Sequence, residues 1–158
     1  MKYITDLKDF AEIERYCDKV IHRGKQLPDK VFTDDYTYFT YTPFDNFRVA
    51  GLFEHVQQYM RITGQEKFWF ASLDPIHLAN FKNGDYPFAA VELTLSDTFD
   101  DFEDAINSVQ TDDDPGGLDY YCNFFIFLSD NLQMGLFLDR SSDLGVCGFK
   151  NQDELMRF

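Results

Sequence analysis

The stretch "YYCNFFIFLSDNLQMGLFLDRSSDLGVCGF", residues 120–149, decides the fold of this 158-residue chain. It contains three apolar segments, "YYCNFFIFL", "LQMGLFLD" and "LGVCGF", separated by the polar groups "SDN" and "RSSD". Short apolar runs divided by turn-forming residues are typical of strands joined by hairpins. The stretch therefore predicts a three-stranded antiparallel meander that places Phe124, Ile126, Leu136 and Leu138 in the core.

Two helices are predicted before this meander. Apolar residues with a period near 3.6 run from residue 7 to residue 21, and Thr5 or Asp6 stands in the position of the N-cap. A second pattern of this kind predicts a helix from residue 45 or 46 to residue 63. We expect both apolar stripes to pack on the sheet.

Further strands are predicted at residues 36–42, 67–73 and 88–96, which are rich in aromatic residues or alternate apolar with polar ones. The segment between the last two, residues 74–87, is predicted to be a loop. Because the strands cluster toward the end of the chain, the order of elements favours an α+β fold with a largely antiparallel sheet. The length fits one globular domain, residues 1–158.

A short acidic helix is predicted within "DTFDDFEDAINSVQTDDDPGGLD", residues 97–119, which holds nine carboxylates and no Lys or Arg. Ser96 or Asp97 is expected to cap this helix, and the turn "DDDPGG" to close the unit. The inward stripe is expected to comprise Phe99, Phe102, Ile106 and Val109.

The net charge of −14 comes almost wholly from one third of the chain. Residues 1–82 carry 11 basic and 12 acidic side chains, whereas residues 83–139 carry 13 acidic and no basic ones. A field of this sign repels nucleic acid and anionic lipid, and it attracts cations or a basic protein surface.

Only part of this acidity is explained by local helix structure. Carboxylates in a first helical turn interact favourably with the helix dipole, which accounts for Asp97, Asp100 and Asp101. Asp100 and Asp104 repel each other at i,i+4 spacing, so compensation must come from elsewhere in the fold or from a partner. We expect a binding face for a basic protein, with a solubility role as the alternative. The candidate residues are Asp97, Asp100, Asp101, Glu103, Asp104, Asp112, Asp113, Asp114, Asp119 and Tyr120.

Motifs of catalysis and metal binding are missing from the sequence. The three cysteines have no metal-ligand spacing, and we expect free buried thiols. His77 is most simply a surface histidine. Asp112 and Asp114 take the first and third places of an EF-hand-like loop, but Gly116 and Asn123 occupy its fifth and twelfth places, so no calcium site is predicted. We therefore expect neither an enzyme nor a protein with a required cofactor or metal.

Aromatic residues are abundant, with 28 Phe, Tyr and Trp in all. Tyrosine is favoured at interfaces because one end of the side chain is apolar and the other is polar. The candidate surface anchors are Tyr36, Tyr38, Tyr41, Tyr86, Tyr120 and Tyr121, each of which could equally fill a Phe-rich core.

A small acidic α+β domain with segments such as "DTFDDFED" and "TDDDPGGLD" resembles the immunity proteins of bacterial toxin systems, including those of contact-dependent growth inhibition. The apolar runs are shorter than the about 20 residues of a membrane span, and the N-terminus lacks the pattern of a signal peptide, so we expect a cytoplasmic protein. The resemblance implies an antitoxin that neutralises a basic nuclease-type toxin by occupying its nucleic-acid-binding surface. It implies a protein partner, with no direct contact to nucleic acid or membrane, and a monomer or weak dimer. The alternatives are an acidic mimic of nucleic acid that inhibits a DNA-binding protein, and a carboxylate-dependent hydrolase.

Overall fold

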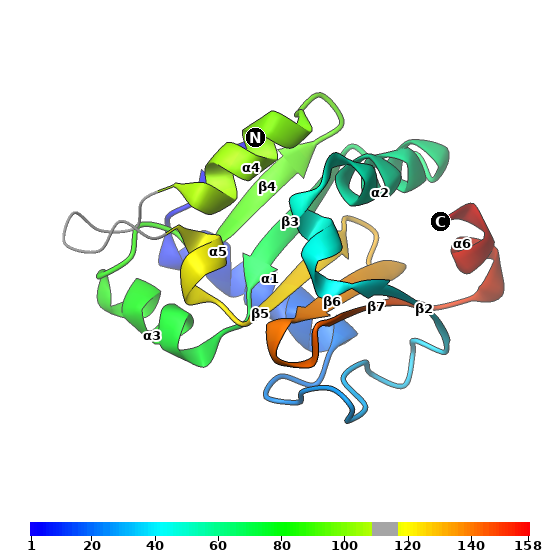
Figure 1. The fold of residues 1–158 in the computed structure, drawn as a ribbon, viewed down its shortest axis with the longest axis horizontal. Coiled ribbons are helices and arrows are strands. Elements are labelled where there is room, and N and C mark those ends of the chain that lie inside the picture. The colour runs from blue at the N-terminus through cyan, green and yellow to red at the C-terminus, as the bar shows by residue number, and fades with distance from the viewer. Residues whose placement is uncertain (109–116) are drawn as a thin grey trace.

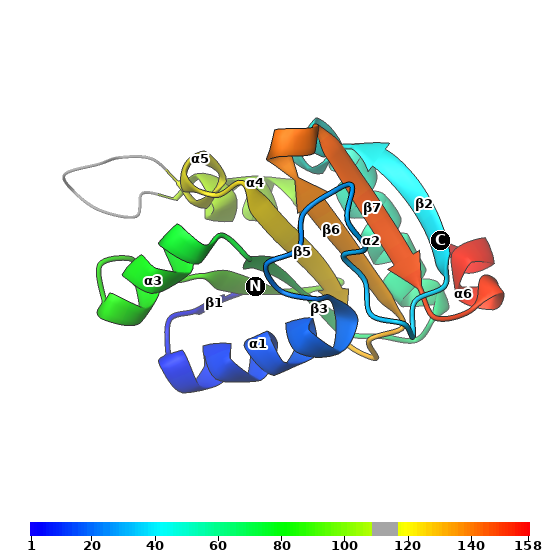
Figure 2. The same cartoon turned by 90° about the horizontal axis from the view of Figure 1, so that it is seen from below.

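The computed structural model describes residues 1–108 and 117–158, except for the side chain of Tyr121. Within these residues one antiparallel sheet has the strand order β1-β4-β3-β5-β6-β7-β2, and helices lie on both of its faces (Figures 1 and 2). The strands are β1 (Lys2–Ile4), β2 (Tyr38–Pro43), β3 (Lys67–Ser72), β4 (Ala90–Thr94), β5 (Phe124–Ser129), β6 (Met134–Asp139) and β7 (Leu144–Phe149). The α+β prediction is confirmed.

The helices alternate with the strands along most of the described chain. The α-helices are α1 (Leu7–Val20), α2 (Ala50–Ile62), α3 (Pro75–Asn83), α4 (Phe99–Asn107), α5 (Leu118–Tyr121) and α6 (Gln152–Arg157). Two 3-10 helices are η1 (Phe44–Arg48) and η2 (Arg140–Ser142).

The central strands are buried on both faces, so the sheet needs two covers. Along β5, Phe125 and Phe127 point to one face, whereas Ile126 and Leu128 point to the other, and all four are buried. The first face packs against α2, η1 and α4, and we call this the α2-side core. The second packs against α1, α3 and the loop of residues 21–36, and we call this the α1-side core. Figure 2 shows α1 and α2 on opposite sides of the sheet.

Phenylalanine rings build the α2-side core. The ring of Phe70 on β3 lies 4.9 Å from that of Phe125, 4.7 Å from that of Phe127 and 5.1 Å from that of Phe102 on α4. Ring pairs at such distances add to the stabilisation from burial alone. These contacts fix α4, which carries the acidic residues, over the middle of the sheet.

The predicted meander and first helix are confirmed. Strands β5, β6 and β7 pair consecutively, and α1 begins after Asp6, whose carboxylate accepts hydrogen bonds from the N–H groups of Lys8 and Asp9. The core prediction is right for Ile126, Leu136 and Leu138.

Phe124 is a correction to that core prediction, because its side chain is only half-buried. It is the first residue of β5 and stacks on Phe137 at a ring distance of 6.3 Å. Both rings line a small cleft together with residues of the segment 21–26, which leaves the Phe124 ring partly uncovered.

The second helix begins later than predicted. Residues 44–48 form η1, Val49 is extended with φ −123°, and α2 starts at Ala50. In a 3-10 helix the side chains at i and i+3 project in the same direction. This tighter turn therefore directs both Phe44 and Phe47 into the α2-side core, where their rings lie 5.0 Å apart.

The loop predicted over residues 74–87 is wrong, because this segment contains α3. Asp74 caps the helix by accepting hydrogen bonds from the N–H groups of Ile76 and His77, Pro75 occupies the first turn, and Gly84 ends it with φ +84°. Only His77 and Phe81 of α3 are buried, so the helix lacks the long apolar stripe by which periodicity is recognised. The short elements β1, α5 and α6 were also not predicted.

We expect Leu136→Ala to reduce the free energy of unfolding by about 2–5 kcal/mol, because Leu136 is fully buried in the α2-side core. Phe124→Ala should cost clearly less, since half-burial leaves a smaller cavity. Urea unfolding of both variants measures the difference. An equal or larger loss for Phe124→Ala would contradict the burial described here.

Candidate functional site

The start of α4 is fixed by a reciprocal pair of hydrogen bonds. The hydroxyl of Thr98 accepts from the N–H of Asp101 at 3.1 Å, and the carboxylate of Asp101 accepts from the N–H of Thr98 at 2.8 Å. This capping box makes Thr98 the N-cap, in place of the predicted Ser96 or Asp97. Hydrogen bonds from the backbone N–H and the hydroxyl of Thr98 lower the pKa of Asp101.

Asp97 joins β4 to α4 from a nearly buried position. Its carboxylate accepts hydrogen bonds from the N–H of Thr94 at 2.7 Å and from the Thr94 hydroxyl at 2.9 Å, and it pairs with the terminal ammonium of Met1 at 2.6 Å. Burial acting alone would raise the pKa of Asp97, but these bonds outweigh it and lower the pKa. The charge of Asp97 therefore serves the fold.

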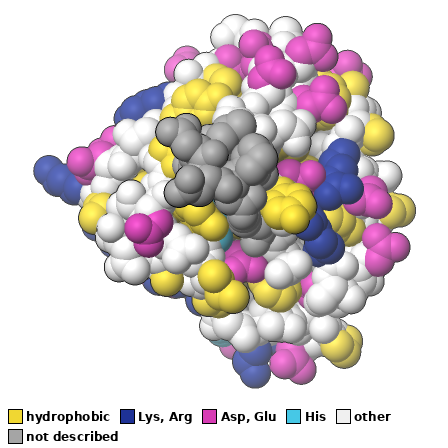
Figure 3. All heavy atoms as spheres, turned by 60° about the vertical axis from the view of Figure 1, so that its left-hand side comes forward, with side chains coloured by type: hydrophobic (Ala, Val, Ile, Leu, Met, Phe, Trp, Pro, Cys, Tyr) yellow, Lys and Arg dark blue, Asp and Glu magenta, His cyan; other side chains and the backbone are white. Residues whose placement is uncertain are grey.

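Three carboxylates remain on the outer side of α4, those of Asp100, Glu103 and Asp104, and we call them the acidic helix face. All three residues are exposed, while the inner side of the helix buries Phe102, Ala105 and Ile106. None of the three forms an ion pair within the described part of the chain, and the last turn of α4 contains no basic residue. In Figure 3 acidic side chains gather at the top of the molecule, the side on which Figure 1 places α4.

Asp119 is neutralised within the fold. Its carboxylate lies 3.0 Å from Nε of Arg48 and 2.7 Å from a terminal nitrogen of Arg140, and only 15% of its side chain is exposed. The two guanidinium groups also lie over Phe47 at 5.4 Å and over Phe44 at 5.3 Å. This cluster ties α5 to η1 and η2, and Arg48 and Arg140 supply from outside residues 83–139 the positive charge that this segment lacks.

Tyr120 on α5 is 71% exposed. Helix α5 packs on α4, and Gly117 permits the approach. A Cβ atom at Gly117 would lie 2.5 Å from the backbone oxygen of Ile106 and 2.6 Å from the backbone of Asn107. The structure therefore brings Tyr120 and the end of α4 into one neighbourhood.

The ten predicted site residues thus divide into groups with different roles. Asp100, Glu103, Asp104 and Tyr120 are exposed on adjoining helices, whereas Asp97, Asp101 and Asp119 bond within the fold. Three candidates, Asp112, Asp113 and Asp114, lie outside the described residues, as do Val109, the first five places of the EF-hand-like pattern and all but the last residue of the predicted turn.

Nucleophilic and metal-binding chemistry finds little support in the described residues. All three cysteines are free and buried, as predicted, and burial raises the pKa of Cys17 and of Cys122 to about 12. Burial also raises the pKa of Cys147 well above its usual range. Within residues 1–108 and 117–158, no three His, Cys, Asp or Glu side chains come together as metal ligands.

His77 is buried, which corrects the prediction of a surface histidine. Helix α3 turns it inward, and its ring lies 4.9 Å from that of Tyr86. The histidine therefore belongs to the packing of α3 on the sheet.

The candidate tyrosines also divide between core and surface. Tyr36 is buried and Tyr86 is half-buried, whereas Tyr38, Tyr41 and Tyr120 are exposed. The side chain of Tyr121 is not among the described parts of the chain.

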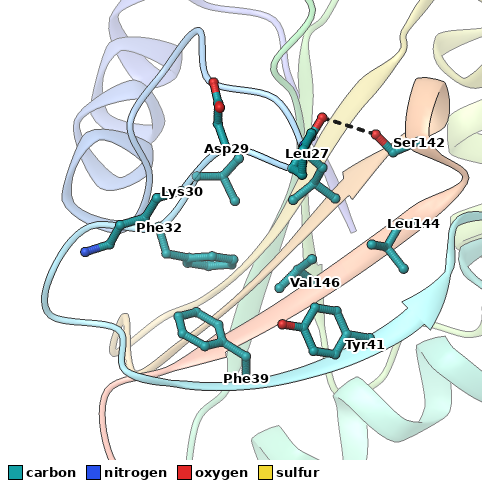
Figure 4. Close-up of a pocket in the computed structure, with 11 residues that line it drawn as sticks. Leu27, Asp29, Lys30, Phe32, Phe39, Tyr41, Ser142, Leu144 and Val146 are labelled. Atoms are coloured by element: carbon teal, nitrogen blue, oxygen red, sulfur yellow. Dashed lines mark hydrogen bonds between the residues drawn. The ribbon is translucent and has the colours of Figure 1, made fainter.

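An apolar groove of about 460 Å³ was not predicted from the sequence (Figure 4). It lies between the loop around Leu27 and Phe32 and the outer strands, where Phe39 and Tyr41 of β2 stand beside Val146 of β7. The strand β2 could be predicted from its residue types, but no pattern in residues 27–32 indicates that this loop folds over β2 and β7 to form the opposite wall.

Comparisons with known proteins gave no relative from which the role of these residues could be inferred. No protein-family model matches this chain, and searches of curated proteins and of solved structures found no significant match. Of the helices in the described residues, none combines the length and the apolar composition that crossing a bilayer requires.

We expect Asp97→Asn to lower the free energy of unfolding at neutral pH, because the amide replaces a carboxylate whose pKa is lower in the fold than its usual 3.8. Such a carboxylate stabilises the fold above its unfolded pKa, and this contribution is lost as the pH falls through the folded pKa. The gap between wild type and variant should therefore narrow below pH 3.8. Urea unfolding at several pH values measures the gap, and a constant gap down to strong acid would refute the role given to Asp97.

Proposed function

We propose that this chain is a cytoplasmic immunity protein that binds and neutralises a basic, nuclease-type toxin domain through the acidic helix face. The observation that carries the proposal is the set of exposed carboxylates of Asp100, Glu103 and Asp104, which lack a cationic partner among the described residues. Like charges at i,i+3 and i,i+4 spacing destabilise a helix. A basic partner relieves this repulsion on binding.

The position of the acidic helix face suits recognition of a large surface. Helix α4 is anchored by Phe102 in the core and by the Thr98 capping box, so its outer carboxylates are held on a rigid support. Tyr120 adds an exposed aromatic side chain on α5, a helix that packs on α4. Aromatic anchors beside charged groups are typical of protein interfaces, where the charges steer association and the aromatic ring supplies buried area.

Inhibition on this proposal is stoichiometric and needs no catalysis by the chain itself. A nuclease presents a basic groove to the phosphates of its substrate, and a row of carboxylates competes for that groove. Burial and the raised pKa values of the three thiols disfavour a cysteine nucleophile.

The test begins with the partner captured by the wild-type protein from its host and identified by mass spectrometry. We expect a basic domain that cleaves nucleic acid and is inhibited at equimolar protein. The triple variant Asp100→Lys, Glu103→Lys and Asp104→Lys should then bind at least about tenfold more weakly, with slower association. Asp101 is left unchanged because it completes the capping box.

A matched control reverses three exposed acids elsewhere, in the variant Glu66→Lys, Asp130→Lys and Asp153→Lys. Both variants change the net charge equally, so a difference between them reports the position of the charge. Association by the wild type should also slow with added salt, because exposed charges are screened beyond about 10 Å at 0.1 M. Equal binding by the two triple variants would leave the acidic helix face with a solubility role only.

A further inference from the structure

Strand β2 forms an edge of the sheet that carries no charge. It pairs with β7 along one side, and within the described residues no strand pairs with its other side. Its sequence, "YFTYTP", contains no Lys, Asp, Glu or Arg, and 65% of Tyr41 and 37% of Phe39 are exposed. Natural proteins commonly protect edge strands with charged side chains, proline or bulges, because an open edge pairs readily with another strand. Of these residue types β2 contains one proline, Pro43, which is its last residue.

The apolar groove continues from this edge onto one face of the sheet. Phe39 and Tyr41 point toward it from β2, and Leu144 and Val146 form its floor on β7 (Figure 4). Helix α6 contacts β2 and lies beside one end of this strand in Figure 2, and its Leu155 and the terminal Phe158 pack on the α2-side core, on the face of the sheet away from the groove. An added strand would thus find both unpaired backbone groups and an adjoining apolar surface.

The local charge indicates which kind of occupant fits. The strands β2 and β7 and the loop across the groove, residues 24–43 and 144–151, contain three Lys and three Asp, although the whole chain has a net charge of −14. The acidic helix face lies elsewhere, over the strands β3 and β5. The neutral edge offers nothing for a strongly charged partner to recognise, and a second copy of this chain approaches it without local repulsion.

The strand sequence is self-complementary when it is read antiparallel about Thr40. In that register Thr40 faces Thr40 of the second copy. Phe39 of each copy faces Tyr41 of the other, so two identical aromatic pairs form. Aromatic pairs and Thr pairs are among the cross-strand pairs that stabilise antiparallel sheets. The two-fold symmetry closes the assembly at a dimer. We propose that the chain forms a homodimer through antiparallel pairing of β2 with β2 about an axis at Thr40, which joins the two apolar grooves into one surface.

The first test measures the oligomeric state by sedimentation equilibrium across a wide range of protein concentration. We expect a reversible dimer of the wild type. Tyr41→Lys should raise the dimer dissociation constant at least about tenfold, because it removes both symmetric aromatic pairs and adds charge to the edge. Ile76→Lys on α3, at a side chain that is 74% exposed, is the matched control and should dimerise as the wild type does.

The second test reads the register directly. In an antiparallel pair, opposite Cα atoms lie about 4.5–5.5 Å apart, within the range of about 4.4–6.8 Å that a disulfide spans. Thr40→Cys should therefore give a covalent dimer on mild oxidation, whereas two copies of Thr42→Cys would be separated by about 13 Å along the strand and should not. The native thiols are buried with raised pKa values and do not interfere.

A wild type that stays monomeric at every concentration overturns the proposal, and so does cross-linking of Thr42→Cys as readily as Thr40→Cys. A monomer that binds an extended peptide at this edge would assign the edge to another partner. The triple charge reversal on α4 should leave the dimer intact, because the acidic helix face does not take part in the pairing. Failure of the immunity proposal and failure of the dimer are thus separately observed.

Discussion

The arrangement of this molecule depends on strands that are apolar on both faces. Antiparallel sheets commonly leave one face to solvent, but here β6 is buried along its whole length and β5 and β7 along most of theirs. Two covering layers are therefore required, and the positions of α1, α2 and α4 follow from the rings and aliphatic chains that they must shield. Charged residues are left to the outer sides of these helices. The acidic residues of α4 lie on its outer side because its inner side packs on Phe70 and Phe127 through Phe102.

The excess of negative charge is less uniform in space than in sequence. Some of the carboxylates form contacts within the fold: Asp97 and Asp101 accept hydrogen bonds at the start of α4, and Asp119 pairs with two arginines. What remains on α4 is a small set of carboxylates on a rigid helix. The β2 edge of the sheet, which lies away from α4, is uncharged and aromatic. The chain thus separates a surface suited to a cationic partner from one suited to an apolar strand.

The sequence predicted the elements whose signals are local. The meander, α1 and the apolar residues of α2 follow from periodicity within one segment, and the fold class follows from their order. Helix α3 was missed because only His77 and Phe81 are buried, although Asp74, Pro75 and Gly84 together mark its ends. The partners of Asp119 were out of reach for another reason: Arg48 lies 71 residues away in the chain, and only the folded topology brings it near. The same holds for the groove, whose two walls come from separate segments.

The single tryptophan of the chain gives the two layers different optical properties. Trp69 belongs to the α1-side core, where its indole N–H donates to Glu92 at 3.2 Å and the ammonium of Lys67 lies 5.1 Å from its ring. The α2-side core contains phenylalanine and tyrosine rings, whereas the indole of Trp69 points to the other face of the sheet. Fluorescence emission therefore reports mainly on the α1-side core, and a change that loosens α2 or α4 while leaving β3 and α1 in place would alter it little. Experiments that follow unfolding by tryptophan emission need a second probe, such as near-ultraviolet circular dichroism, to observe the layer that carries the acidic residues.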